Sequence, residues 1–218
     1  MGACQATIGR RNLRVWQTGN GKPMRTAAAL IAILAAISLY AQALVSTGLM
    51  AGAGPLAVVW RMAGYLTVLG NLATLILMVR VVVTGTISAQ TAALITVVMA
   101  VVGLGYHILL AGIWQPQGLA WWADQGLHTA VPALVALWWA CFAPKAGLVG
   151  RDVLGWLIWP IGYAAYALVR GMASGFYPYP FMDVATLGLV QVVVNVAGLA
   201  AAFLALGLLL IGCARIIR

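Results

Sequence analysis

Thr67 and His128 place a hydroxyl and an imidazole within apolar stretches of this chain, and together they could carry out nucleophilic chemistry. A threonine hydroxyl is a weak nucleophile and needs an adjacent base, a role that suits histidine because its charge changes near neutral pH. On spacing alone, two simpler interpretations stand beside this one. Thr67 would bond the carbonyl of Ala63, four residues back in a helix, and His128 would be a buried histidine bonded to a neighbouring helix.

The segment around Thr67 carries a polar stripe. Trp60, Gly64, Thr67, Asn71 and Thr74 recur three or four residues apart, a spacing that puts side chains on one face of a helix. Polar and ionisable groups are costly in a lipid bilayer. This face is therefore expected to point into a helix bundle.

A second polar row consists of Tyr163, Tyr166 and Arg170, which also share one helical face. Together with the stripe it predicts a polar pocket in the outer half of the membrane. Tyr163, Arg170 and Asn71 are candidate hydrogen-bond donors to an oxyanion, and Tyr166 is a candidate substrate-binding residue.

Pro132 follows His128 by four residues. Because proline has no N–H, the carbonyl of His128 loses its helical partner and the helix is expected to bend there. Asp124 precedes His128 by four residues and could orient its imidazole, although Gly126 between them makes a regular helix less certain.

The remaining candidates have two interpretations each. Arg61 and Arg170 are either side chains that extend toward the membrane surface or cations that bind a carboxylate or a lipid headgroup. His107 is either a buried histidine bonded to a neighbouring helix or part of the substrate site, and Asp183 is a candidate residue of that site. The aromatic segment 177–181 is either a turn between helices or a lid over the pocket.

Other kinds of site are disfavoured by the composition. The G-x-S-x-G motif of serine hydrolases is missing from the sequence. Two histidines and three mostly peripheral acids do not supply a zinc site, so we expect no metal, and no organic cofactor is indicated. Outside the basic N-terminal segment, the residues behind the formal net charge of +9 sit one or two at a time between apolar runs, which disfavours a nucleic-acid partner.

Hydrophobic residues make up 64% of the 218 residues and charged residues only 7%, a composition typical of an integral membrane protein. We predict an all-α bundle of six transmembrane helices, at residues 27–46, 56–79, 92–113, 119–143, 153–169 and 184–214. Basic residues gather before the first run, at alternate connections and at the end, which places both termini in the cytoplasm. Residues 1–26 form a basic cytoplasmic segment, and residues 27–218 form one transmembrane domain.

Three short pieces within residues 40–183 resemble a known family: Tyr65-Leu66-Thr67, His128-Thr129 with Pro132, and Arg170-Gly171 with Tyr177-Pro178-Tyr179-Pro180-Phe181-Met182-Asp183. They resemble the androgen-induced-gene family of multi-span membrane proteins, which includes the androgen-dependent TFPI-regulating protein, and most closely its six-helix prokaryotic branch. Animal members of that family are threonine hydrolases that cleave fatty acid esters of hydroxy fatty acids with one threonine and one histidine. The resemblance implies that Thr67 is the nucleophile and His128 the base.

The resemblance thus implies a hydrolase of lipid esters embedded in the cell membrane, the inner membrane of a bacterium, with a lipid or fatty-acyl ester as its partner. The alternatives are a non-enzymatic lipid or small-molecule binding protein, a small transporter, and an assembly subunit. The inner halves of the predicted helices are nearly pure Val, Leu and Ala, which favours a closed pocket over a passage. The oligomeric state is not predicted.

Overall fold

The computed structural model describes residues 21–217. These residues form helices and connecting turns, with no strand among them. The elements, where η marks the π- and 3₁₀-helical segments, are α1 (Gly21–Leu49), α2 (Pro55–Met62), α3 (Leu66–Thr84), α4 (Ala89–Gly105), η1 (Tyr106–Leu110), α5 (Leu119–Gln125), η2 (Gly126–Ala130), α6 (Val131–Phe142), α7 (Asp152–Trp156), α8 (Ile158–Ser174), η3 (Pro180–Met182), α9 (Val184–Leu187) and α10 (Leu189–Ile216).

Five helical segments are long and apolar enough to cross a membrane: α1, α3, α4 with η1, α7 with α8, and α10. The prediction of an all-α membrane protein is confirmed at this level. The fourth predicted run, 119–143, is helical from residue 119 to residue 142, but η2 divides it into pieces of 7, 5 and 12 residues. The first helix begins at Gly21 rather than at residue 27, and residues 1–20 of the predicted N-terminal segment lie outside the described residues.

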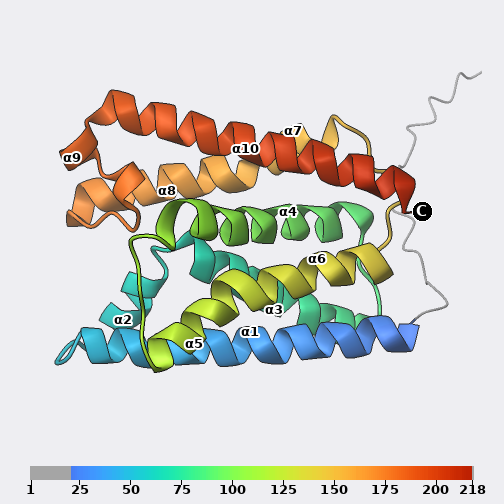
Figure 1. Ribbon diagram of the computed structural model, residues 1–218, viewed down its shortest axis with the longest axis horizontal. Coiled ribbons are helices and arrows are strands. Elements are labelled where there is room, and N and C mark those ends of the chain that lie inside the picture. The colour runs from blue at the N-terminus through green and yellow to red at the C-terminus, as the bar shows by residue number, and fades with distance from the viewer. Residues whose placement is uncertain (1–20, 218) are drawn as a thin grey trace, which may run out of the picture.

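The helices form a bundle with α4 at its centre (Figure 1). In this view α10 and α8 lie along one side and α1 along the other, while α4 contacts α3, α6 and α10. The start of α1 and the end of α10 lie at the same end of the bundle. The opposite end holds α2, the start of α5, and α9. We call it the site end because α3, with Thr67 in its first turn, follows directly after α2 in the chain.

The predicted helix 56–79 is wrong in one respect that matters for the site. It is two helices, since α2 ends at Met62 and α3 begins at Leu66. Tyr65, the residue before α3, has an extended backbone (φ −90°, ψ 128°). Thr67 therefore lies in the first turn of a helix, and the helical carbonyl that was expected to accept its hydroxyl is not available to it.

Two π-helical segments carry the two histidines, His107 in η1 and His128 in η2. In η2 the N–H of Val131 bonds the carbonyl of Gly126, five residues back. The wider turn lies directly before Pro132, which cannot donate to His128, so the predicted disturbance of this helix takes the form of a π-helical turn. Such turns are frequent at functional sites.

Candidate active site

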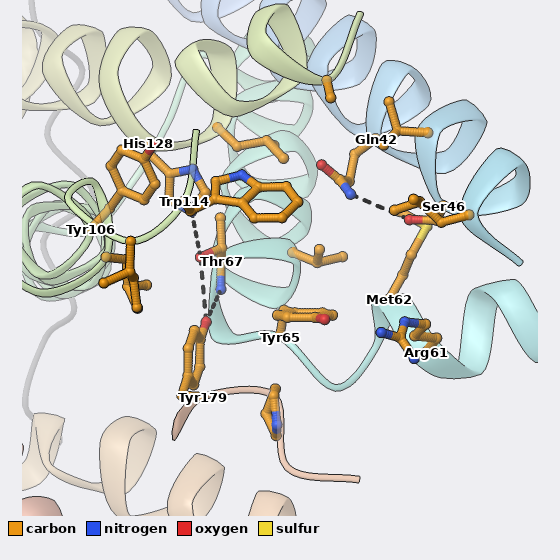
Figure 2. Close-up of a pocket in the computed structure, with 18 of the residues that line it drawn as sticks. Gln42, Ser46, Arg61, Met62, Tyr65, Thr67, Tyr106, Trp114, His128 and Tyr179 are labelled. Atoms are coloured by element: carbon orange, nitrogen blue, oxygen red, sulfur yellow. Dashed lines mark hydrogen bonds between the residues drawn. The ribbon is translucent and has the colours of Figure 1, made fainter. Parts of the chain in front are cut away.

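The hydroxyl of Thr67 and the imidazole of His128 meet although 61 residues separate them in the chain. Thr67 Oγ1 lies 3.1 Å from His128 Nε2 (Figure 2), and the threonine is only 7% exposed. The carbonyl of Ala63 instead accepts a hydrogen bond from the hydroxyl of Tyr166. The structure thus brings together the two residues that could activate a nucleophile, at a distance that allows proton transfer.

Asp124 contacts the other ring nitrogen of His128. Its Oδ1 lies 3.1 Å from Nδ1, and its backbone carbonyl oxygen is also 3.1 Å from Nδ1. The carboxylate is 4% exposed, and one oxygen, Oδ2, has no hydrogen-bond partner among the described residues. Tyr106 stacks on the imidazole with the ring centroids 4.1 Å apart. These contacts hold the ring so that Nε2 faces Thr67. A hydroxyl, an imidazole and a carboxylate in this order could act as nucleophile, base and orienting acid.

Close packing of α1 against η2 supports this arrangement. Gly126 lies between Asp124 and His128 and is helical (φ −60°, ψ −52°). A β-carbon at Gly126 would lie 2.0 Å from Ser38 Oγ. The glycine that made a regular helix less certain is therefore the residue that allows α1 to approach, and Asp124 and His128 face the same way on this segment.

Tyr179 is a further polar residue in contact with Thr67. Its hydroxyl lies 3.4 Å from Thr67 Oγ1 and 3.4 Å from the Thr67 backbone nitrogen (Figure 2). Tyr179 belongs to the turn between α8 and η3. Burial raises the pKa of this hydroxyl, while its hydrogen bonds to Thr67 lower the pKa to a smaller degree. The side chain is protonated at neutral pH and can donate a hydrogen bond.

Thr67, His128 and Tyr179 line a cavity of about 460 Å³. Its wall is mostly apolar and comes from α1, α2, α3, η1, α5, η2 and the segment 178–180, all at or near the site end. Arg61 also lines the cavity, away from His128 (Figure 2). Its guanidinium lies over the ring of Phe176, 4.5 Å from the centroid, and has no hydrogen-bond partner among the described residues. The cavity is an apolar cleft with the polar groups of Thr67, His128 and Tyr179 at one place and the cation of Arg61 at another.

The three polar residues of α8 share one face, as predicted, but their hydrogen bonds go to backbone. Tyr163 donates to the carbonyl of Gly64 at 2.9 Å, Tyr166 to that of Ala63 at 3.2 Å, and Arg170 to that of Trp60. The break between α2 and α3 leaves these carbonyls without helical partners. The row from α8 satisfies them, and in doing so it sets where α3 begins.

Arg170 is buried, with 6% of its surface exposed, and has no acidic partner among the described residues. Its guanidinium lies 4.5 Å from the ring centroid of Trp60 and 5.8 Å from that of Phe176. A β-carbon at Gly64 would lie 1.9 Å from Nη1 of Arg170. Arg170 is thus enclosed by the residues of the helix break, and it does not line the cavity that holds Arg61.

Three further candidates lie apart from the cavity. Asn71 is fully buried and donates to the carbonyls of Thr67 and Leu127, so it ties α3 to η2. His107 Nε2 lies 3.0 Å from Thr129 Oγ1 on an exposed part of the bundle. Asp183 caps α9 by accepting from the amides of Ala185 and Thr186.

Sequence reasoning missed Tyr106 as a contact of the imidazole and named Tyr179 only as part of a turn or lid. Tyr106 follows the regular apolar pattern of its helix, and no local signal marks it. Tyr179 carries a signal, since two prolines flank an aromatic residue in a short connection. The structure shows that Pro178, Tyr179 and Pro180 line the cavity.

No protein-family model matches the chain, and no significant similarity was found to a curated protein or to a solved structure.

Proposed function

We propose that this protein is a membrane-embedded hydrolase of lipid esters, of the kind in which a fatty acid is esterified to a hydroxy fatty acid. The observation that carries the proposal is the 3.1 Å contact of Thr67 Oγ1 with His128 Nε2 on the wall of an apolar cavity. A buried hydroxyl beside a partly buried imidazole at this distance forms the minimal unit of nucleophilic ester cleavage. Asp124 at Nδ1 supplies the orienting acid.

The reaction follows from these roles. His128 Nε2 takes the proton of Thr67 Oγ1 as the oxygen bonds to the ester carbonyl carbon, and the carbonyl electron pair moves to its oxygen. Collapse of this intermediate breaks the bond to the alcohol, which receives the proton from His128. Water activated by His128 then cleaves the acyl-threonine, releasing the acid and restoring the hydroxyl.

The cavity supports an amphiphilic substrate. Its apolar wall suits an acyl chain, and Arg61 is a cation on that wall with no acid beside it among the described residues. A free carboxylate on the substrate would pair with this guanidinium while the ester lies at Thr67. This is the chemistry of a fatty acid ester that retains one carboxyl group.

For the membrane topology we propose six spans, with the interrupted helix 119–142 as the fourth. The start of α1 and the end of α10 lie at one end of the bundle (Figure 1), and the basic residues favour the cytoplasm for that end. The cavity then faces the outer leaflet of the cell membrane. A lipid substrate would reach it without crossing the bilayer.

Covalent labelling with a fluorophosphonate probe tests the proposal. Attack by Thr67 forms a phosphorus–oxygen bond and releases fluoride, while His128 takes the threonine proton. We expect intact-mass and peptide analysis of the detergent-extracted protein to find one label on Thr67. Thr67→Val and His128→Gln should each abolish it.

The control is Thr74→Val, because the hydroxyl of Thr74 bonds the carbonyl of Gly70 in its own helix and lies outside the cavity. This variant should label like the wild type. Absence of any label in folded protein that binds the probe would contradict the hydrolase proposal. It would favour a non-enzymatic lipid-binding protein, which the largely apolar cavity also suits.

A further inference from the structure

We propose that Tyr179 is a catalytic residue whose hydroxyl donates a hydrogen bond to the oxyanion that forms when Thr67 attacks an ester. This inference rests on the proposed hydrolase function and assigns the group that the Thr67–His128 pair lacks. Ester cleavage places a negative charge on the former carbonyl oxygen, and fixed donors at that point are the largest single contribution in many enzymes.

The position of the hydroxyl is the first argument. It lies 3.4 Å from Thr67 Oγ1 and lines the same cavity. An ester carbon bonded to Thr67 Oγ1 would bring its oxygen within reach of this hydroxyl. The residues that sequence analysis named as oxyanion donors are directed elsewhere, since Asn71, Tyr163 and Arg170 all donate to backbone carbonyls.

The directions of the hydrogen bonds are the second argument. The N–H of Thr67 donates to the oxygen of Tyr179, which leaves the Tyr179 hydrogen free to point at Thr67 Oγ1. In the histidine tautomer with its hydrogen on Nδ1, that N–H donates to Asp124 and Nε2 accepts from the hydroxyl of Thr67. At 3.4 Å the Tyr179 contacts are longer than a strong O–H···O bond. The hydroxyl hydrogen can therefore rotate toward a better acceptor, which an oxyanion is, while the oxygen itself stays in place.

The rigidity of Tyr179 is the third argument. Its ring stacks on Phe181 with centroids 5.2 Å apart, and it meets the rings of Tyr65 and Tyr163 edge to face, at 6.0 and 6.4 Å. The side chain is only 8% exposed. Asn195 in α10 donates to the carbonyl of Phe181 at 2.8 Å and so fastens the turn. A donor fixed before the reaction costs no reorganisation when the charge appears.

The chemical step balances without another reactant. As the Thr67 oxygen bonds to the ester carbon, its proton goes to His128 and the carbonyl pair becomes the oxyanion, which accepts the hydrogen of Tyr179. Tyr179 keeps its proton throughout. The first-turn amides of α3 lie next to this point and add the positive end of the helix dipole.

Tyr179→Phe tests the assignment because it removes the hydroxyl and keeps the ring. In hydrolysis of a fatty acid ester of a hydroxy fatty acid, we expect kcat to fall about 10²- to 10³-fold, the usual loss for one oxyanion donor, with KM changed less than about threefold. The matched control is Tyr177→Phe in the same turn. Tyr177 packs on Gly171 and does not line the cavity, so this variant should keep the wild-type kcat.

Two ketone inhibitors separate catalysis from packing. A long-chain trifluoromethyl ketone forms a tetrahedral adduct with the threonine and imitates the oxyanion, while the matching methyl ketone binds without forming it. In Tyr179→Phe the inhibition constant of the trifluoromethyl ketone should rise by the factor that kcat/KM loses, and that of the methyl ketone should stay constant. A purely structural role would weaken both ketones alike.

The outcomes are distinct. If wild-type protein neither cleaves an ester nor labels at Thr67, the hydrolase proposal fails and this inference fails with it. If Thr67 labels in a His128-dependent way but Tyr179→Phe retains full kcat, or weakens both ketones equally, only the role of Tyr179 is overturned. Should Tyr179→Phe not fold, 3-fluorotyrosine at position 179 changes the acidity of the hydroxyl with little change in shape. Its kcat must then differ from that of the wild type for the proposal to stand.

Discussion

The carboxylate of Asp124 lies 3.1 Å from Nδ1 of His128, on a helix that becomes π-helical between the two residues. The contact leaves Nε2 to face Thr67. In an isolated helix, residues four apart already lie on one face. Here Gly126 allows α1 to pack closely against this segment. The segment is thereby positioned so that His128 reaches Thr67 on α3.

Asp124→Asn should lower kcat strongly. The amide has nearly the same shape, but it can offer an N–H to Nδ1 and so favour the tautomer in which Nε2 carries the proton and cannot accept one. We expect a loss of at least about 10²-fold in kcat for ester hydrolysis, in protein that keeps its thermal unfolding midpoint.

Asp152→Asn serves as the control for this change. Asp152 accepts from Gln90 and from the amide of Val149, and its carboxylate has no contact with the cavity. Equal activity of Asp124→Asn and the wild type would show that the carboxylate does not act through His128.

Arg170→Lys should weaken both stability and turnover. A lysine cannot reproduce the planar guanidinium that bonds the carbonyl of Trp60 while it stacks on two aromatic rings. We expect a loss of about 1–3 kcal/mol in the free energy of unfolding, and a lower rate of fluorophosphonate labelling because the start of α3 shifts. Arg80→Lys, at an exposed position whose side chain bonds none of residues 21–217, should change neither quantity. Full labelling in a destabilised Arg170→Lys protein would show that the bonds of Arg170 at the helix break do not affect the reactivity of Thr67.

Arg61→Gln should alter substrate preference rather than chemistry. Arg61 is exposed at the cavity, so an ion pair with a substrate carboxylate is worth about 1 kcal/mol or less, which corresponds to a KM about two- to fivefold higher. The methyl ester of the same substrate has no carboxylate and should show no change. Arg61→Lys should retain the preference, and a fall in kcat for both substrates would place Arg61 nearer to the reaction than we propose.

Gly126→Ala should destabilise the protein. The new β-carbon would lie 2.0 Å from Ser38 Oγ and 2.8 Å from Ser38 Cβ, and overpacking of this kind costs about 1–3 kcal/mol. The double variant with Ser38→Gly should recover part of the loss, since both clashing atoms are removed. Gly162→Ala, where no atom lies within 4 Å of the added carbon, provides the control. The thermal unfolding midpoint in detergent is compared among the wild type, Gly126→Ala, the double variant and Gly162→Ala.

Local features of the sequence were enough to predict the membrane class, the approximate positions of the long helices and the disturbance before Pro132. The length of an apolar run can be read directly from the chain, and a proline disturbs only the helical turn before it. Both effects can therefore be predicted without knowing the fold. The face shared by Tyr163, Tyr166 and Arg170 followed from the same periodicity. The Thr67–His128 pair was predicted from a family resemblance, and their catalytic role stays a prediction.

The tertiary structure alone decided where the helix breaks before Thr67. Residues 63–65 contain no proline, and the stripe through Gly64 continues with helical spacing, so local rules favour an unbroken helix. Donors from α8, about 100 residues away, satisfy the carbonyls that a break exposes, and the buried Arg170 needs the space beside Gly64. The break frees the Thr67 hydroxyl for His128 and Tyr179. The sequence determines which chemical groups are present, whereas contacts between distant segments decide which of them meet, because their free energy depends on packing that no local spacing encodes.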